Sequence, residues 1–418
     1  MRAAWWNIFF FCLVQQLSAQ ESNLIVLQNA DSLVGSRTPT GEDIRLLSGH
    51  VRFSQSNVRV WCNKAIQYLT RNEVELIGNV KVVRDTVTLT AKHGMYFGNT
   101  KQATCEENVR LETKHVVLYA DYGTYFSEEK RAYFHKNVRV IDSATTIFSD
   151  ELTYFEKERK SIAVSNVRIV NASDNITMFG QYLEHFDEKK YSKMTQHPFL
   201  MQIDTSSKGE IDTLAVKSLV MESFDDSSRK MLANDSVVIV RGELAARCGV
   251  VQYFTKDERI ELQTNPVVWY EQNQITGDSI SLFLRKNKLQ TAAIRGRAFA
   301  ISQSDSNFKN RYNQLTGRKI MMHFAENKLS EMIVERNAIS LYFLYDGKKP
   351  NGMNKTSGDY ISTHFKDGTL ETIRVLKGIE GLYYPENLVV KNENKYNIDG
   401  FLLRNDRPTY HTVFGKAK

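Results

Sequence analysis

The sequence is organised around a strand–turn–strand segment that returns at a fixed interval. Its clearest copy is Ile77–Ala91 (IGNVKVVRDTVTLTA), where apolar and polar residues alternate on both sides of a turn at Arg84 and Asp85. Alternation of this kind with β-branched residues is typical of strands with one buried face. The Asn-Val step of this segment returns every 29 residues, at His50-Val51, Asn79-Val80, Asn108-Val109, Asn137-Val138 and Asn166-Val167.

The downstream half keeps this rhythm less strictly. A fixed period of this size indicates a repeat architecture. We assign the same slot to His197-Pro198, Asn234-Asp235, Asn265-Pro266, Gly296-Arg297 and Asn337-Ala338.

Each repeat also carries a small residue followed by a polar one, with an aromatic residue soon after. A sharply bent strand needs a small residue because a large side chain would clash with the neighbouring strand. We interpret the polar residue as a cap of the bend. The copies include Ala120-Asp121, Ser149-Asp150, Gly277-Asp278, Gly317-Arg318 and Gly358-Asp359.

The ends of the chain differ from the repeats. Arg2 precedes an apolar run over residues 3–14, and Ser18 and Ala19 follow, as in a secretory signal peptide cleaved after Ala19; the alternative is an uncleaved anchor. We therefore predict a signal peptide at 1–19, one repeat block at 20–200, a second at 201–385, and a polar basic tail at 386–418. Within the tail, Tyr396–Leu403 could add a strand.

Composition excludes several classes of function. The chain is 42% hydrophobic and 25% charged, as in a folded globular protein. Its net charge of +7 is spread along the repeats, so no nucleic-acid partner is expected. The excess suits an anionic partner met at many points, or solubility alone.

No chemistry-bearing motif interrupts the repeats. The nine histidines form no metal-ligand spacing, and neither a nucleophile elbow nor a phosphate loop occurs. Three cysteines remain after signal cleavage: Cys62, Cys105 and Cys248. An odd number cannot form a fully paired disulfide framework, and we predict that their side chains are buried. We predict no enzyme, no catalytic residue, no metal and no cofactor.

The repeat resembles the OstA family, which contains LptA and the periplasmic domain of LptD. The resemblance rests on Gly78-Asn79-Val80 and on the bends at Ala120-Asp121, Ser149-Asp150 and Gly277-Asp278, and it covers residues 23–385. It implies an all-β fold of stacked antiparallel strands in an elongated, twisted, V-shaped β-jellyroll, open along one edge. The LptD type needs a large C-terminal barrel, which is not expected in the short stretch after Pro385.

The resemblance also implies a function in the periplasm of a Gram-negative bacterium. Members hold the acyl chains of lipid A in the groove and form part of a bridge that carries lipopolysaccharide to the outer membrane. The partners implied are lipopolysaccharide and LptC-like and LptD-like proteins, joined by edge-strand addition. Head-to-tail self-assembly follows from the same unpaired edges.

The apolar positions of the repeats give the candidate binding face. Alternation places them on one side of the strands. In an open groove they would face acyl chains, at ~0.8 kcal/mol for each buried methylene. In a closed stack they would be only core, as in the alternative reading of a structural β-solenoid scaffold or surface adhesin. The predicted lipid-groove residues are Val51, Phe53, Val80, Val82, Leu89, Val109, Leu111, Leu118, Val138, Val140, Ile147, Val167 and Ile169.

Overall fold

The computed structural model describes residues 25–55, 57–114, 116–142, 145–173, 175–205, 211–224, 229–285, 288–305, 307–325, 328–366 and 369–414. The predicted signal peptide at residues 1–19 lies outside the described residues. The chain forms two compact units, residues 1–114 and 115–418. The division into repeat blocks at residue 200 and a tail from residue 386 stays a prediction.

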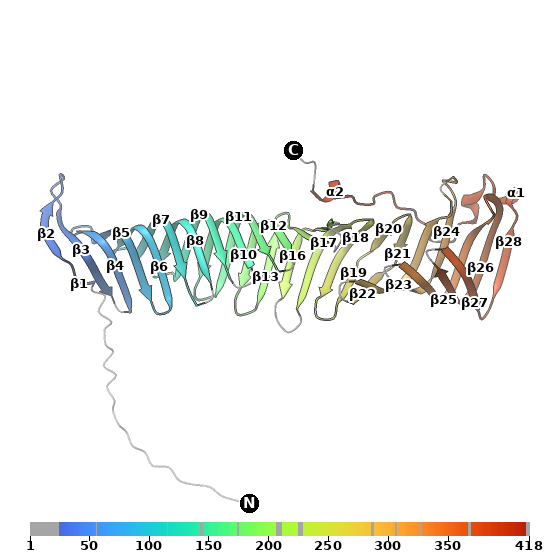
Figure 1. The fold of residues 1–418 in the computed structure, drawn as a ribbon, viewed down its shortest axis with the longest axis horizontal. Coiled ribbons are helices and arrows are strands. Elements are labelled where there is room, and N and C mark those ends of the chain that lie inside the picture. The colour runs from blue at the N-terminus through green and yellow to red at the C-terminus, as the bar shows by residue number, and fades with distance from the viewer. Residues whose placement is uncertain are drawn as a thin grey trace, which may run out of the picture. The chain divides into compact units, whose positions relative to one another are not determined.

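The first unit is built from antiparallel strands (Figure 1). Strands β3 to β7 pair in chain order, and β1 and β2 both pair with β3. The strands are β1 (Val26–Asn29), β2 (Ser32–Arg37), β3 (Asp43–Gln55), β4 (Val58–Tyr68), β5 (Glu73–Arg84), β6 (Val87–Phe97) and β7 (Gln102–Glu112).

The second unit continues the same pattern with antiparallel neighbours. Its first strands are β8 (Val117–Phe126), β9 (Arg131–Ile141), β10 (Thr145–Phe155), β11 (Lys160–Asn171), β12 (Ile176–Phe186), β13 (Tyr191–Thr195), β14 (Phe199–Thr205), β15 (Ile211–Lys217), β16 (Val220–Phe224), β17 (Lys230–Arg241) and β18 (Leu244–Phe254). Then come β19 (Arg259–Gln263), β20 (Val267–Tyr270), β21 (Asn273–Thr276), β22 (Ser279–Arg285), β23 (Lys288–Gln303), β24 (Tyr312–Ala325), β25 (Lys328–Asp346), β26 (Lys349–Lys366), β27 (Thr369–Leu376) and β28 (Glu380–Tyr384).

Short helices follow the last strand: α1 (Glu386–Val389), the 3-10 turn η1 (Glu393–Tyr396) and α2 (Tyr410–Phe414). The prediction of an all-β fold of stacked antiparallel strands, of the OstA/LptA-like jellyroll kind, is confirmed. Among the described residues, no helix is long and apolar enough to cross a membrane.

Along the sheet, every second long strand, or the junction of two short strands in its place, is bent by two successive residues with positive φ. Antiparallel pairing skips these residues, so the register shifts there. Gly and Asn adopt this left-handed conformation most easily, which explains the Asn of the repeated step. The pairs, with φ between 44° and 75°, are Gly49/His50, Gly78/Asn79, Glu107/Asn108, Lys136/Asn137, Ser165/Asn166, Gln196/His197, Asp235/Ser236, Thr264/Asn265, Gly296/Arg297, Arg336/Asn337 and Lys377/Gly378.

Two of the downstream slots predicted from the sequence are wrong. The second left-handed residue of a pair and the buried apolar residue that follows it define the slot. The slot lies at Ser236-Val237 and not at Asn234-Asp235, and at Arg297-Ala298 and not at Gly296-Arg297. The prediction matched Asn and Gly identities, whereas Ser and Arg also occupy the left-handed slot here. The slots at His197, Asn265 and Asn337 are confirmed.

The bends fold each strand so that its two halves face one another. One set of halves is joined by turns and is called wall A; the other set is called wall B. The wall A turns include residues 69–72 and 98–101 in the first unit, and 127–130 and 156–159 in the second. One buried cluster in the first unit joins Leu76 of wall A to Val80 of wall B. In the second unit the main core likewise joins Ile294 to Leu315. Each unit therefore has a V-shaped cross-section with an apolar inner face.

The small residue of each bend motif is required by packing. A Cβ built on Gly277 would lie 2.6 Å from Ile294 Cγ2, and one on Gly358 would lie 2.7 Å from Val375 Cγ1. Real Cβ atoms do not approach that closely. The steric reason inferred from the sequence is thus confirmed at these positions.

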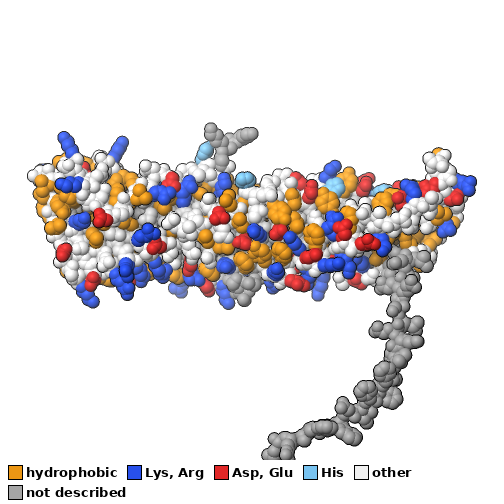
Figure 2. All heavy atoms as spheres, turned by 180° about the vertical axis from the view of Figure 1, so that it is seen from behind, with side chains coloured by type: hydrophobic (Ala, Val, Ile, Leu, Met, Phe, Trp, Pro, Cys, Tyr) orange, Lys and Arg blue, Asp and Glu red, His pale blue; other side chains and the backbone are white. Residues whose placement is uncertain are grey.

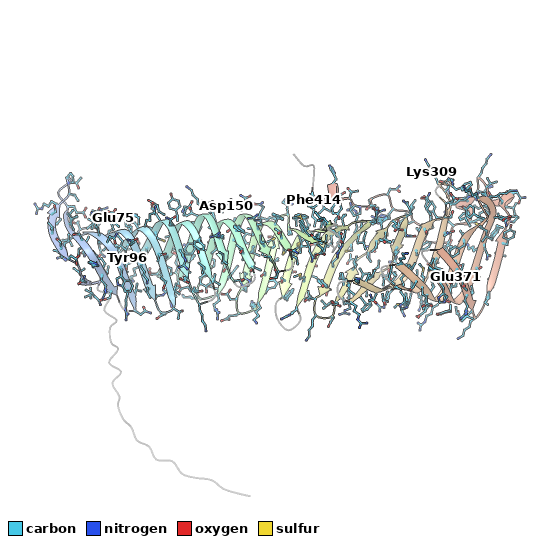
Figure 3. The ribbon with its side chains drawn as sticks, in the orientation of Figure 1. Glu75, Tyr96, Asp150, Lys309, Glu371 and Phe414 are labelled. Atoms are coloured by element: carbon cyan, nitrogen blue, oxygen red, sulfur yellow. The ribbon has the colours of Figure 1, made fainter. Side chains whose placement is uncertain are left out.

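The polar residue of the motif caps the bend of the next strand. Asn137 Nδ2 donates to Asp121 Oδ2 at 2.8 Å, and Asn166 Nδ2 donates to Asp150 Oδ2 at 2.7 Å (Asp150 is labelled in Figure 3). These bonds join adjacent strands where the backbone ladder is interrupted. The interpretation of Asp121 and Asp150 as structural caps is confirmed.

The segment after β28 packs on the outer face of wall B within the second unit. Ala298 and Ala300 of β23 face the inner core, whereas Phe299 and Ile301 contact Val389 and Ile398 of this segment. Figure 1 shows it running from α1 back along the unit to α2, which packs against β15 and β17.

The predicted strand at Tyr396–Leu403 is wrong. The segment is held by side chains instead of a backbone ladder: Gln314 Nε2 donates to Asn397 Oδ1 at 2.6 Å, and Gln274 Nε2 donates to the Leu402 carbonyl at 2.8 Å. Because these side-chain amides satisfy its backbone and polar groups, the segment needs no strand pairing.

Arg311 fastens the beginning of this segment. Its side chain is 1% exposed, and its guanidinium lies 2.6 Å from Glu386 and 3.4 Å from Glu393. The rings of Phe308 and Phe343 cover it, with centroids 4.5 Å and 5.4 Å away. The buried cation is therefore compensated on both sides.

We expect Gly277→Ala to lower the stability of the second unit by about 1–3 kcal/mol, because its methyl group would overlap the buried Ile294 side chain. The midpoint of urea denaturation checks this. The matched control is Gly381→Ala, whose nearest neighbour would be Thr356 Oγ1 at 3.9 Å. Equal midpoints for the two variants would refute the steric requirement.

We expect Arg311→Ala to lower stability by about 3 kcal/mol, since it leaves two carboxylates without their buried cation. Protease cleavage within residues 386–414 should also become faster. Lys309→Ala, in the same loop and exposed, is the control. If both variants are cleaved at the native rate, Arg311 does not hold the segment.

Candidate functional site

The register of the strands brings the predicted lipid-groove residues to the inner face of each unit. In the first unit Val60 pairs with Phe53 and Val82, and Leu89 pairs with Val82 and Leu111. In the second, Val140 pairs with Leu118 and Ile147, and Ile147 also pairs with Ile169. Cross-strand partners share a face, so each unit carries a row of apolar side chains along wall B.

These residues divide into two groups by exposure. Those next to the bend are buried: Val51, Val80 and Val109 in the first unit, and Val138 and Val167 in the second. Those two residues further out are only half-buried: Val82, Leu89 and Leu111, and Val140, Ile147 and Ile169. Phe53 and Leu118 are exceptions, because both are buried although they lie further out.

The outer group lies on the inner face of wall B, opposite wall A, and its side chains keep part of their surface exposed. We call this half-open apolar surface the trough; each unit has its own.

The opposite side of the trough carries residues that were not among the predicted site residues. Tyr96 on β6 (Figure 3) pairs with Val74 and Ala103 on the inner face of wall A in the first unit. Tyr125 and Tyr154 hold the same position in the second unit, where both pair with Ala132. All three are half-buried.

The signal for these tyrosines was present in the sequence. They are the aromatic residues that follow the bend motif, again 29 residues apart. Burial raises the pKa of Tyr154, and nearby Asp187 raises it further. Its hydroxyl therefore stays protonated and neutral, which gives this lip of the trough a polar but uncharged edge.

The inner face of the second unit closes toward its C-terminal strands. Ile294, Ile320, Val334 and Ile361, from β23 to β26, have no exposed surface. Phe324 and Phe365 pack against the same cluster. Two residues further from the bend, Met322 and Met332 are also buried, whereas Tyr125 and Tyr154 at that place on β8 and β10 are half-buried, so the half-exposed part of this trough lies along β8 to β12.

The outer face of wall B has a different character. Arg139 lies over the Tyr119 ring at 4.7 Å, and Arg168 lies over the Phe148 ring at 4.3 Å. Arg139 and Arg168 are exposed, as the alternation predicted. On the face drawn in Figure 2, hydrophobic side chains are interspersed with Lys and Arg side chains.

The part of the chain that the structure describes contains no group of three or more His, Cys, Asp or Glu side chains able to hold a metal ion. Cys62, Cys105 and Cys248 are free and buried, as predicted. Burial raises the pKa of Cys62 to about 11 and that of Cys248 to about 12. Both thiols are protonated at neutral pH and are poor nucleophiles.

Bent antiparallel strands with an apolar inner face define each unit as a β-jellyroll with a lengthwise trough. Two family models match the chain: "OstA-like protein" over residues 22–179, and "LptA/(LptD N-terminal domain) LPS transport protein" over residues 118–288. The chain is therefore similar to the OstA-like family over these residues.

Among solved structures, the chain is similar to LptH from Pseudomonas aeruginosa, described as the LptA homologous periplasmic component of the lipopolysaccharide transport device. The match covers 34% of this chain and 95% of LptH, with 13% identity and a TM-score of 0.27. The comparison with curated proteins gave no match.

Proposed function

We propose that this protein is a periplasmic carrier of lipopolysaccharide in a Gram-negative bacterium. In this proposal the acyl chains of lipid A lie in the trough, and the protein forms part of a bridge that supplies the outer membrane. The family descriptions support the transport role. The binding site is inferred from one observation. Val138 and Val167 are buried, whereas Val140 and Ile169, two residues further from the bend, are only half-buried.

The half-buried row can supply the affinity without a specific polar contact. Each methylene moved from water to an apolar surface contributes ~0.8 kcal/mol, so an acyl chain of about a dozen carbons gains roughly 10 kcal/mol if fully covered. Loss of translational and rotational freedom offsets several kcal/mol of this gain. A surface that binds by area also tolerates chains of different length.

A structural scaffold with a filled interior is the second candidate. The closed inner face at Ile294, Ile320 and Val334 supports it for the C-terminal strands of the second unit. The half-exposed inner face along β8 to β12 favours the carrier. The two functions differ in whether lipid reaches Val140.

We expect p-benzoylphenylalanine at Val140 to crosslink to lipopolysaccharide on irradiation, because this side chain points into the trough. The matched control is the same residue at Arg139, its neighbour on β9, which points to the outer face. Electrophoresis with detection of lipopolysaccharide gives the readout. Crosslinking of both positions alike, or of neither, would favour the scaffold.

The edges of both units support assembly by strand addition. In the first unit β1 and β2 pair only with β3 among the described strands, and Val26 and Val34 are 51% and 52% exposed. In the second unit β27 and β28 likewise pair only with β26, and Leu382 is 57% exposed. Unpaired strands with apolar side chains add further strands readily. The proposed partners are LptC-like and LptD-like proteins and further copies of this chain.

We expect the weight-average mass in sedimentation equilibrium to rise with protein concentration, as copies join through their edges. Val34→Lys should shift the mass toward the monomer, since a charged edge strand resists pairing. Ile211→Lys should behave as the native protein, because Ile211 is 73% exposed but lies on β15, which pairs with both β14 and β17. A native protein that stays monomeric over a wide concentration range would contradict self-assembly.

A further inference from the structure

A second concave site lies on the outer side of the bends in the second unit, where wall A and wall B join, away from the trough. Its volume is about 840 Å³. Its apolar floor includes Ile339 and Ile398, which belong to the cluster between wall B and the C-terminal segment and not to the inner core. We call this site the basic cleft. It is lined by Arg295, Gly296, Arg297, Thr316, Gly317, Arg318, Lys319, Glu335, Arg336, Asn337, Ile339, Lys355, Ile398 and Asp399.

The basic cleft holds six cationic side chains and two carboxylates. Some of these cations already have partners. Arg297 lies 2.6 Å from Asp278, and Lys319 lies 3.3 Å from Glu335. Arg295 donates only to a neutral group, the Ser281 hydroxyl, at 3.0 Å.

Three further cations of the cleft lack a carboxylate partner. Among the described residues, Arg318, Arg336 and Lys355 take part in no ion pair. Arg318 and Arg336 are exposed and Lys355 is half-buried. The remaining carboxylate of the cleft, Asp399, can balance only one of these three charges, so the cleft keeps an excess of positive charge that favours an anion.

The charge at this bend is not balanced within the fold. At some equivalent bends the polar residue is a carboxylate that accepts from the next strand, as Asp121 does from Asn137 and Asp278 does from Arg297. At β6 it is a cation, Lys92, which lies 3.1 Å from Glu107 of the next strand. At β24 the position is Arg318, and among the described residues it has no carboxylate partner of this kind, so its charge is available to a ligand outside the fold.

We propose that the basic cleft binds a phosphorylated saccharide. Arginine matches the geometry of phosphate oxygens with two parallel hydrogen bonds, and Arg318 and Arg336 have free guanidinium groups for this. The apolar surface of Ile339 and Ile398 can cover one face of a sugar ring. The volume lies within the usual range for small-molecule sites. The inference does not rest on the trough, since the cleft is on the outer side of the bends.

Isothermal titration calorimetry with glucose 1-phosphate tests this proposal on the native chain and on Arg318→Asp. The variant introduces the carboxylate that Asp121, Asp150 and Asp278 place at their bends, so its fold should be kept, and circular dichroism checks this. We expect saturable binding by the native protein and about tenfold weaker binding by Arg318→Asp, because a phosphate-facing cation becomes an anion. Arg336→Ala should also weaken binding.

Arg139→Asp is the matched control, with the same change of charge on the outer face of wall B but outside the cleft; its affinity should stay native. Glucose without phosphate should not bind. Displacement of glucose 1-phosphate by lipopolysaccharide micelles would identify the source as a lipid headgroup, and no displacement would identify a soluble sugar phosphate. The proposal is overturned if the native protein does not bind glucose 1-phosphate saturably, or if Arg318→Asp binds it as tightly. Because this probe has no acyl chain, failure here leaves the trough untouched, and loss of crosslinking at Val140 leaves the cleft untouched.

Discussion

The pair of left-handed residues at the bend of every second long strand is the constraint on which the rest of the structure depends. A left-handed non-glycine residue costs roughly 1–2 kcal/mol, and Asn or Gly lowers that cost. Two in succession, as at Gly78 and Asn79, turn the strand and interrupt its ladder. The side-chain bonds from Asn137 to Asp121 and from Asn166 to Asp150 restore a link between strands where the ladder is interrupted. Without these bends each half-strand would lie in one flat sheet, and no inner face would exist.

The exposure of the apolar residues follows from the bend. Close to it the walls converge, so Val80 and Val138 fill the space with their own packing. Further out, Val82 and Val140 are only half-buried. In the C-terminal strands of the second unit the residues further out, such as Met322 and Met332, are buried, and Phe324 and Phe365 pack against the same cluster.

The C-terminal segment covers the outer side of wall B. In the second unit that side carries Phe299, Ile301 and other apolar residues, which must be covered. The segment covers them with Val389 and Ile398 and is fixed at its start by the buried Arg311. Its passage beside the bends of β23 to β26 also supplies one edge of the basic cleft. A segment that reads as a polar tail in the sequence is therefore part of the folded unit.

The sequence by itself determined the strands, their bends and the identity of the apolar face. These depend on local rules: alternation with a period of two, Asn or Gly at a left-handed slot, and a small residue where a strand bends. The same rules mislocated two bends, at residues 236 and 297, because Ser and Arg took the slot there. They also did not identify the tyrosines of wall A as site residues. The position of an aromatic residue at the end of the motif does not show whether its side chain lies on the inner or the outer face of the strand.

Only the tertiary structure decided which apolar residues keep exposed surface, where the C-terminal segment lies, and which cations converge. Exposure depends on the distance between walls, which a strand pattern does not contain. The basic residues appear evenly spread along the chain, yet Arg295, Arg318, Arg336 and Lys355 line one cleft because successive antiparallel strands place residues about twenty apart side by side.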